Sequence, residues 1–595
     1  MALSPALQCT IVLAGILLVT AGPLAAETPG SPAGAGQAGG DPSRPAPVCE
    51  PSVLDSPYIP VDSWVYPAVL RLYSLGFIDN VFLGMRPWTR ASVGHMLEEA
   101  GGRIDDADAG PATDEAQGIY EALNEELSQD MQGPCRAYQG GTRVESVYSV
   151  IRAMTGTPLR DSFHLGQSVI NDYNRPYANG LNNYTGASGY ASAGRFLLYV
   201  RGEFQGAPST AGYSSALAEQ LATIDRTTNY FNSTTPIPYN GQPTIPAGPI
   251  ATATNGRLLE AYVSAHVLNH EISFGKQDDW LGPGLGGGMA YSNNAENIYS
   301  FRINRVEPLH IPGLSYLTGP FRYEFLVGSL KGHTYPRDPW VHVEKISFRP
   351  TENLEFGFER TVIWGGKGHE PITLHTFLKS FFGVQNVTGA EKFSRNDPGA
   401  RFGAFDFSYR LPFVRNWLTL YSDSEVHDDI SAIDAPRRAA WRPGIYLSHV
   451  PGVPKLDVRV EAVTTDPPVS TSNSGLFMYD ETIQRQGYTN KGQLFGDWIG
   501  REGKGGQGWL TYHLSGNEWI QVGVRNQKVA KDFIPGGTTL NDINFQAVKR
   551  IGKDFEINGN FSYERWKAPI YLPGPQTVTN TTIQLTWFPQ RKVSF

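Results

Sequence analysis

From residue 141 to the C-terminus, apolar and polar residues alternate with a period of two. Residues 555–564 show the pattern clearly, with an aromatic or branched apolar side chain at almost every second position. Successive side chains of a β-strand point to opposite faces, so this pattern predicts strands with one apolar and one polar face. Clusters of glycine and proline, as in residues 282–288, separate these segments and reverse the chain direction. The region is therefore predicted to form one antiparallel sheet, either a soluble sandwich or a barrel closed in a membrane.

The lengths of the connections distinguish these two architectures. From the fourth expected strand onward, every second connection is tight, as around Asn269 and at residues 412–416. The other connections are mostly long, as at residues 281–295 and 365–399. Outer-membrane barrels combine short periplasmic turns with long outer loops, whereas a Greek-key sandwich does not sort its connections in this way. We therefore predict an all-β membrane barrel of about 18 antiparallel strands over residues 141–595.

The beginning of the sheet fits this scheme less well. Residues 163–172 are assigned to one strand and residues 189–206 to a single long strand. The connection between them and the one at residues 307–319 are longer than periplasmic turns, and the outer connection at residues 334–338 is short.

The residues before the sheet divide into three parts. Residues 1–26 contain a short apolar run that ends near small residues, which is typical of a secretory signal peptide, although a basic start is missing. Residues 27–50 are rich in glycine, alanine, proline and serine and are predicted to be a disordered linker. Residues 51–140 are predicted to form a small periplasmic helical unit.

Start and stop signals predict three helices in this unit. The first begins near Asp62 and ends at Gly76. Thr89 is expected to cap the second, with Gly101 and its neighbour as the stop. The third begins at Thr113, and acidic residues in its first turn are favourable there.

Cys49 and Cys135 are the only cysteines expected in the exported protein, because Cys9 lies within the signal peptide. In an oxidising compartment they can pair, which would stabilise the chain by about 4 kcal/mol on a chain-entropy estimate. The alternative is a pair of unbonded, buried thiols.

The C-terminal residues and the net charge indicate which partners the protein has. The last strand alternates up to Trp587 and the chain ends in Phe595, which is similar to the signal read by the outer-membrane barrel assembly machinery. The net charge of -8 and the lack of basic segments predict no nucleic-acid partner. These features predict a location in the outer membrane, with outer-membrane lipid around the barrel.

Several separated motifs resemble those of the capsule-assembly Wzi family. They are GKQ, WLGPG and SNNA within residues 275–295, LEFGFERTVIWGG at residues 354–366 and NDPGARFGAFDFSYRLP at residues 396–412. Two departures are Lys276, where arginine is expected, and Leu281, where a second tryptophan is common. The resemblance implies an outer-membrane barrel of about 18 strands, blocked by a periplasmic helical unit, that acts as a lectin for surface polysaccharide.

Residues 66–100 carry a second likeness, because they resemble an S-layer homology repeat, a module that binds cell-wall polymers. Two interpretations follow. The helices either plug or pack against the barrel, or they bind peptidoglycan as a further partner.

No catalytic arrangement emerges from the sequence. His369 and Glu370 lack the second histidine of a zinc-binding helix. The glycine-rich run at residues 282–288 does not lead from a buried strand into a helix, as a phosphate site would require. Asp278 and Asp279 would face opposite sides of a strand and cannot act as a pair in glycoside hydrolysis. The sequence therefore predicts no enzyme, no cofactor and no metal site.

Sugar binding requires flat aromatic faces together with amide or cationic donors, on loops held by a rigid scaffold. The expected outer loops contain Trp280, Asn293, Asn294, Trp364, Lys367, His369, Arg437, Arg438 and Trp441. The tryptophans also fit an aromatic girdle at strand ends, and the two asparagines also fit a turn cap. The inward positions hold charged residues that are expected to pair with one another in the lumen, namely Arg302, Glu324, Glu359, Asp406 and Arg410.

The sequence thus predicts a lectin-like barrel that binds and retains capsular or exopolysaccharide at the cell surface during capsule assembly. Many weak contacts with a repeating polymer would supply the affinity. The alternative is an outer-membrane porin for sugars or small anions, with the helical segment as a wall tether.

Overall fold

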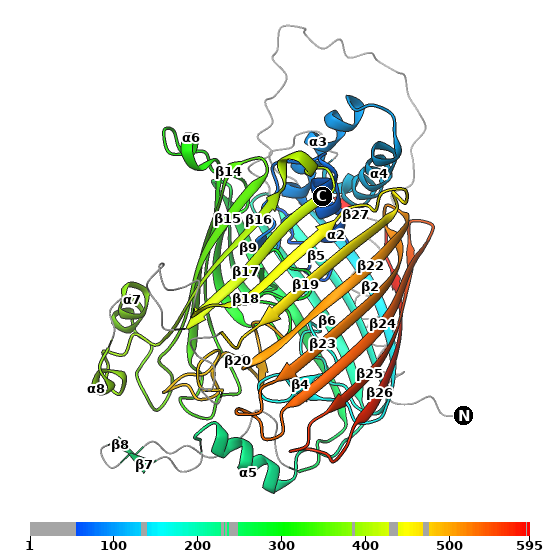
Figure 1. Cartoon of the computed structure of the whole chain (residues 1–595). Coiled ribbons are helices and arrows are strands. Elements are labelled where there is room, and N and C mark those ends of the chain that lie inside the picture. The colour runs from blue at the N-terminus through cyan, green and yellow to red at the C-terminus, as the bar shows by residue number, and fades with distance from the viewer. Residues whose placement is uncertain are drawn as a thin grey trace, which may run out of the picture.

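The structure, a computed structural model, describes residues 55–131, 140–227, 231–232, 235–236, 248–383, 387–427, 438–467, 475–590 and 592–594. Its main element is a closed antiparallel barrel of 18 strands (Figure 1). The strands are β2 (Gly140–Thr155), β5 (Gly180–Ala193), β6 (Phe196–Ala207), β9 (Ala253–Val267), β10 (His270–Lys276), β12 (Tyr299–Arg305), β13 (Phe321–Ser329), β14 (Trp340–Thr351), β15 (Leu354–Trp364), β16 (Ala400–Arg410), β17 (Leu418–His427), β18 (Ala440–Leu447), β19 (Leu456–Thr464), β22 (Gly503–Ser515), β23 (Glu518–Val529), β24 (Thr538–Ile551), β25 (Phe555–Lys567) and β26 (Gln576–Trp587). A short β27 (Lys592–Ser594) follows β26 and also pairs with β2, which closes the barrel.

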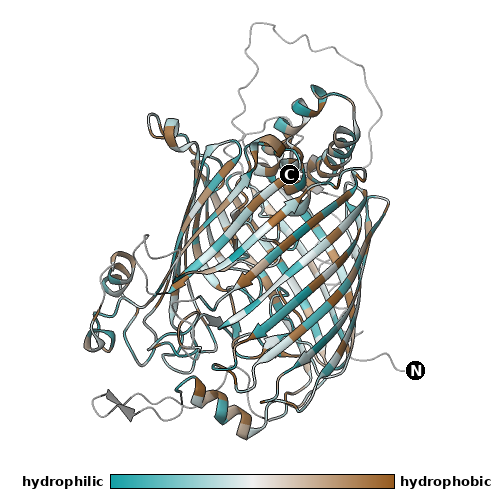
Figure 2. Cartoon of the chain, in the orientation of Figure 1, coloured by the Kyte–Doolittle hydropathy of each residue, from teal (hydrophilic) through white to brown (hydrophobic). Residues whose placement is uncertain are grey.

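The two faces of the barrel wall differ in polarity, as the alternating sequence predicts. Outward side chains are apolar and exposed, such as Phe358 at 56% and Ile583 at 56%. Inward side chains are polar or charged, and Arg302 and Glu324 are buried. Apolar and polar residues therefore alternate along the strands in Figure 2. An apolar exterior around a polar interior is the arrangement of a membrane barrel, so the predicted fold class is confirmed.

Two strand predictions at the beginning of the barrel are wrong, although the total is right. Residues 163–172 form no barrel strand, and beside them lies only the short pair β3 (Arg160–Asp161) and β4 (Gly166–Gln167). The single strand predicted at residues 189–206 is two strands, β5 and β6, joined by a turn in which Gly194 has a φ of 57°. β5 was missed because it consists mostly of glycine, alanine, serine and asparagine, which give little apolar contrast.

The N-terminal helices are α2 (Val65–Leu75), α3 (Arg90–Asp105) and α4 (Pro111–Met131), with β1 (Met85–Arg86) between α2 and α3. Gly76 ends α2 in the left-handed conformation and the Thr89 side chain caps α3, as predicted. The predicted stop of α3 at Gly101 is wrong, because the helix continues for another turn. A Cβ atom at Gly101 would lie 3.0 Å from the hydroxyl of Tyr120 on α4, so the glycine allows close helix packing instead of ending the helix.

The two ends of the barrel differ (Figure 1). The turn end carries the tight turns, the helices α2–α4, the short α6 (Ser315–Thr318) and the 3-10 turn at Pro412–Val414. The loop end carries the long connections, which include α5 (Ser215–Ile224), α7 (Leu374–Phe382), α8 (Gly389–Lys392), β7 (Phe231–Asn232), β8 (Thr235–Pro236), β11 (Trp280–Leu281), β20 (Thr489–Asn490) and β21 (Gln493–Leu494). Among the described residues, no helix is long and apolar enough to cross a membrane.

Candidate functional site

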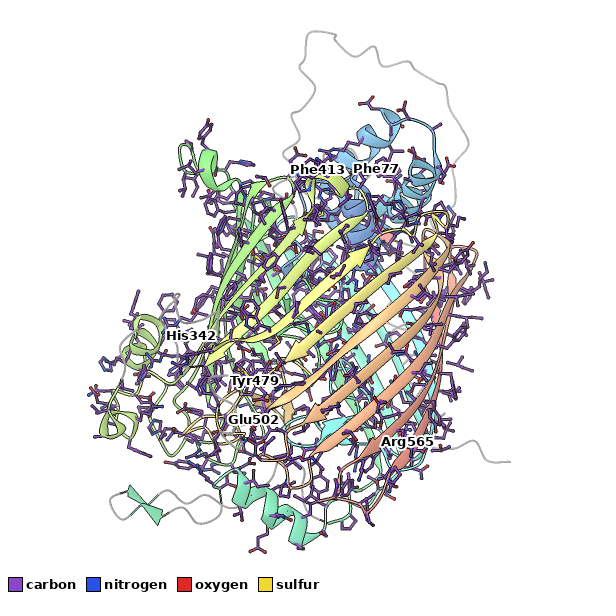
Figure 3. The ribbon with its side chains drawn as sticks, in the orientation of Figure 1. Phe77, His342, Phe413, Tyr479, Glu502 and Arg565 are labelled. Carbon is purple, nitrogen blue, oxygen red and sulfur yellow. The ribbon has the colours of Figure 1, made fainter. Side chains whose placement is uncertain are left out.

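Three connections from the loop end fold into the lumen and are here called the loop plug. They are residues 156–179, 277–298 and 475–502. Their side chains form an apolar cluster with inward residues of β13–β16, and Tyr479, labelled in Figure 3, lies in it fully buried. The Tyr479 hydroxyl donates a 2.6 Å hydrogen bond to the carbonyl of Met289, which ties two of the connections together.

The glycine-rich run at residues 282–288 lets the loop plug approach the barrel wall closely. The amides of Leu285 and Gly286 donate to the Glu461 carboxylate over 2.8 Å and 3.1 Å. A Cβ atom at Gly286 would lie only 2.0 Å from the side-chain oxygen of Gln507. A larger residue would therefore displace the wall side chains Gln507, Arg442 and Trp509, or the plug backbone itself. This is the structural reason for the glycines, which the sequence alone did not show.

The plug is also held by buried ion pairs. Arg442 on β18 contacts Asp497 of the loop plug at 2.6 Å and Glu461 on β19 at 2.7 Å. Arg302 on β12 contacts Asp279 at 3.1 Å and Glu324 at 3.2 Å. The predicted pairing of inward charges is therefore observed.

The remaining predicted inward residues are paired in the same way. Lys345 contacts Asp406 at 2.5 Å and Glu359 at 3.7 Å. Arg410 pairs with Asp79 and donates to the Tyr73 carbonyl in the helical unit. Charges taken out of water are tolerated when they are paired in this manner.

The helical unit docks into the turn end and meets the loop plug. β1 pairs with β11, so that Arg86 lies opposite Trp280. The amides of Leu83 and Gly84 donate to the Glu355 carboxylate of β15 at 2.7 Å and 3.1 Å. Phe77 of this unit lies at the turn end in Figure 3, close to the rim of the barrel. The lumen is thus filled from both ends.

A cavity of about 550 Å³ remains between the helical unit, the loop plug and the barrel wall, and it is here called the lumen cavity. Aromatic and cationic side chains line part of it, among them Tyr148, Tyr184, Trp509, Trp519, Arg152 and Arg201. Uncharged polar residues of β23–β26 also line it, namely Gln521, Gln546, Asn558, Thr582 and Gln584, together with acidic residues such as Glu145 and Asp457. Pockets that bind small ligands have this range of volumes and this mixture of aromatic and polar groups.

The structure brings only two of the predicted sugar-binding residues together. Trp280 and Asn293 both line the lumen cavity, and among the described residues the Trp280 indole nitrogen and the Asn293 amide oxygen have no hydrogen-bonding partner. Asn294 is buried in the loop plug and donates to the Leu494 carbonyl at 3.0 Å. Asn294 therefore lies within the plug, away from the surface.

The remaining predicted residues lie at the loop end. Trp364 is fully buried beneath α7, with its ring 5.9 Å from that of Phe377. Trp441 is partly buried on the outward face, edge-on to Phe405 at 5.1 Å, as an aromatic girdle would place it. The Lys367 side chain is 70% exposed and contacts Asp338 at 2.9 Å.

Three other predicted residues belong to outer connections. His369 bonds to Asp397 at 2.9 Å. The guanidinium of Arg438 lies 5.6 Å from the Phe477 ring. Arg437 lies outside the described residues, as do Cys49 and Cys135.

Sequence reasoning missed a buried charge cluster at the loop end. His164 donates to Asp161 at 2.9 Å and to Asp225 at 2.8 Å, and Arg501 contacts Asp225 at 2.7 Å. Burial opposes the protonation of His164, but the two carboxylates raise its pKa to about 9. Burial would raise the pKa of Asp225, but His164 and Arg501 lower it to about 2. The cluster joins α5 to the loop plug. Asp161 and His164 are three residues apart, but Asp225 and Arg501 are far from them in sequence, so no local motif shows the whole cluster.

Comparison with known proteins gives the family. The family model described as capsule assembly protein Wzi matches residues 150–581. A relative from Klebsiella pneumoniae, an uncharacterized 55.8 kDa protein in the cps region, is 28% identical over 207 residues, which are 34% of this chain. This chain spans 40% of that relative's length.

Comparison with solved structures bears on the fold. Wzi of Escherichia coli, an outer-membrane protein involved in group 1 capsule assembly and a carbohydrate-binding β-barrel, aligns with a TM-score of 0.60 and 17% identity over 89% of this chain and 98% of that chain. Pseudomonas aeruginosa OprD aligns with a TM-score of 0.37 and 8% identity over 76% of this chain and 95% of that chain. Because the family model matches well over half of its residues, this chain belongs to the Wzi capsule assembly family, as its motifs predicted, and is an outer-membrane protein.

Proposed function

We propose that this protein binds capsular or exopolysaccharide and retains it at the cell surface during capsule assembly. The observation that carries the proposal is the match of residues 150–581 to the capsule assembly family. The fold shared with the carbohydrate-binding barrel of Escherichia coli supports it. We infer that the protein acts by binding and not by catalysis.

The filled lumen favours binding over conduction. The helical unit enters from the turn end and the loop plug from the loop end, and they meet where β1 pairs with β11. Ion pairs such as Arg442 with Asp497 hold the plug to the wall. A porin would need a continuous aqueous path, which these contacts obstruct.

We infer that the turn end faces the periplasm and the loop end the cell exterior, since outer-membrane barrels have short periplasmic turns. The helical unit would then be periplasmic. The outer surface would present lysine side chains that are about half or more exposed, namely Lys331, Lys367, Lys491 and Lys504. Exposed cations on a rigid scaffold suit a polymer with acidic sugars.

The predicted sugar-binding residues would then act in different ways. Lys367 would contact the polymer at the outer surface, with Arg437 on another outer connection. Trp441 on the outward face of β18 and His369, whose side chain is only 6% exposed, would support these connections. Trp280 and Asn293 would reach a saccharide only through the lumen cavity. Asn294 and Trp364 would support the loops from within.

Further predictions accompany this function. Outer-membrane lipid would surround the apolar belt, and the assembly machinery would read the end of the chain at Phe595. Residues 1–26 would be removed on export, residues 27–50 would form the linker, and Cys49 would pair with Cys135. Peptidoglycan stays a predicted partner of the helical unit.

The experiment is polysaccharide retention in the native host. A strain that lacks the gene is complemented with the wild-type chain or with Lys367→Ala combined with Lys331→Ala, and cell-bound and released polysaccharide are measured. The deletion should release polysaccharide, the wild type should restore retention, and the double variant should restore it in part. Assembly of each variant is checked by its heat-dependent gel shift. Equal retention of polysaccharide with and without the protein would contradict the proposal.

A further inference from the structure

Three potential metal ligands meet at the base of the connection between β15 and β16. They are His369 and Glu370, just after β15, and Asp397, just before β16. One ligand atom from each lies within 4.8 Å of the other two. The His369 Nε2 and Asp397 Oδ2 atoms are 2.9 Å apart. The cluster lies outside the lumen cavity and takes no part in the contacts of the loop plug described above.

The backbone holds these side chains in place. Gly366 and Gly368 have φ values of 112° and 102°, which favour glycine and let the chain turn sharply after β15. The Gly399 amide donates to Asp397 Oδ1 at 3.0 Å, which leaves Oδ2 directed at His369. The ligands are therefore anchored to the ends of two paired strands.

Glu370 is the member that the protein leaves unsatisfied. It is 2% exposed, and neither of its carboxylate oxygens has a side-chain hydrogen-bonding partner among the described residues, although the Gly365 amide lies nearby. Leaving a buried polar group unpaired costs about 1–3 kcal/mol, and more when the group is charged. The orphaned oxygens lie beside an imidazole and a second carboxylate, which is the surrounding expected where a cation binds.

We propose that His369, Glu370 and Asp397 bind a divalent first-row cation, Zn²⁺ or Mn²⁺. One imidazole nitrogen and two carboxylate oxygens are a ligand set that such ions accept. Ca²⁺ prefers oxygen ligands alone, so the histidine argues against it. Two carboxylates would also neutralise the charge of the ion in this buried position.

The bound ion would close the long connection into a ring at its base. The ring carries α7, whose Phe377 and Phe381 pack on Phe325 of the outward barrel face with ring centroids 6.3 Å and 6.1 Å apart. The ion would thus hold a surface-exposed loop in one position. The ligand set is not visible as a local sequence motif, because Asp397 comes from the far end of the connection.

The test uses the full-length chain purified in detergent, stripped with EDTA and titrated with ZnCl₂ or MnCl₂. Bound metal is measured by mass spectrometry after dialysis, and melting temperature is measured in parallel. We expect about one ion per chain for the preferred metal and a higher melting temperature. Glu370→Gln should weaken binding at least tenfold, whereas Glu391→Gln, an exposed carboxylate of the same connection, should bind like the wild type.

Two controls keep the result decisive. The heat-dependent gel shift reports whether Glu370→Gln assembles, and Asp397→Asn replaces it if it does not. Metal held by other histidines would still bind to Glu370→Gln. The result is therefore the difference in bound metal between Glu370→Gln and Glu391→Gln. Absence of saturable binding by the wild type, or equal binding by Glu370→Gln, would overturn the proposal and leave a plain His369–Asp397 ion pair.

Discussion

Two sectors of the barrel wall handle their inward side chains differently. The charged sector, β12–β19, carries ionised residues that are buried in pairs, such as Arg442 with Glu461 and Lys345 with Asp406. The neutral sector, β23–β26, presents mostly amides and hydroxyls to the lumen cavity, with Glu556 as a charged exception. Its Arg525–Glu564 pair bonds to Ser168 of the loop plug.

The difference shows how the sequence of the wall decides where the lumen is filled. A charge in a region of low dielectric needs a partner, and in the charged sector the partner comes from a neighbouring strand, as Glu461 for Arg442, or from the loop plug, as Asp497 for Arg442. Amides and hydroxyls can bond to water equally well, so the neutral sector does not require a cover. Ion pairs such as Arg442 with Asp497 tie the loop plug to the charged sector, and the neutral sector presents uncharged polar side chains to the lumen cavity.

The largest expected effect comes from breaking a pair in the charged sector. Arg442→Met removes the partner of both Glu461 and Asp497, which are buried. An uncompensated buried carboxylate destabilises by about 3–5 kcal/mol. The urea midpoint, followed by tryptophan fluorescence, should fall strongly. An unchanged midpoint would mean that the ion pairs of Arg442 do not hold the plug.

The His164 cluster predicts that the stability of the contact between α5 and the loop plug depends on pH. The pKa of His164 is raised to about 9 from an ordinary 6.5, so its stabilising effect is complete below pH 6.5 and is lost as the pH rises through 9. The loss is about 3 kcal/mol. Hydrogen exchange of α5 and residues 475–502 should quicken above pH 9.

A variant separates this effect from general alkaline unfolding. In His164→Gln the added exchange above pH 9 should vanish, because no imidazolium remains between Asp161 and Asp225. Exchange in strands β23–β26 serves as the internal control, and at each pH it should be the same in the variant as in the wild type. The same pH profile in the variant would assign the effect to another group.

The smallest effect is expected in the neutral sector. Gln546→Met should change the free energy of unfolding by no more than about 1 kcal/mol, because the amide faces the lumen cavity and leaves no buried charge behind. The urea midpoint measured alongside Arg442→Met checks this. Equal losses in the two variants would erase the distinction between the sectors.

The strands were largely predictable because their pattern is local. β25 was expected at residues 554–566 and lies at Phe555–Lys567, since large apolar residues mark its outward face. β5 lacks such residues and was missed. The cap at Thr89 was predicted from one side chain, whereas the end of α3 depended on the contact of Gly101 with Tyr120.

The candidate site was less predictable because burial depends on distant segments. Trp364 and Trp441 both stand at strand ends, but only Trp364 is covered by α7. Asn294 is enclosed by residues that follow much later in the chain, such as Leu494. No local pattern encodes these contacts. The sequence therefore predicted residue types that suit a sugar site without showing which of them reach solvent.

The most direct test of the central claim is binding of purified host polysaccharide to the full-length chain in nanodiscs, together with a planar-bilayer recording of the same preparation. A plugged barrel that binds polysaccharide should give saturable binding, weakened by Lys367→Ala combined with Lys331→Ala, and no steady large conductance. Steady large conductance without polysaccharide binding would contradict the account and assign the barrel to transport.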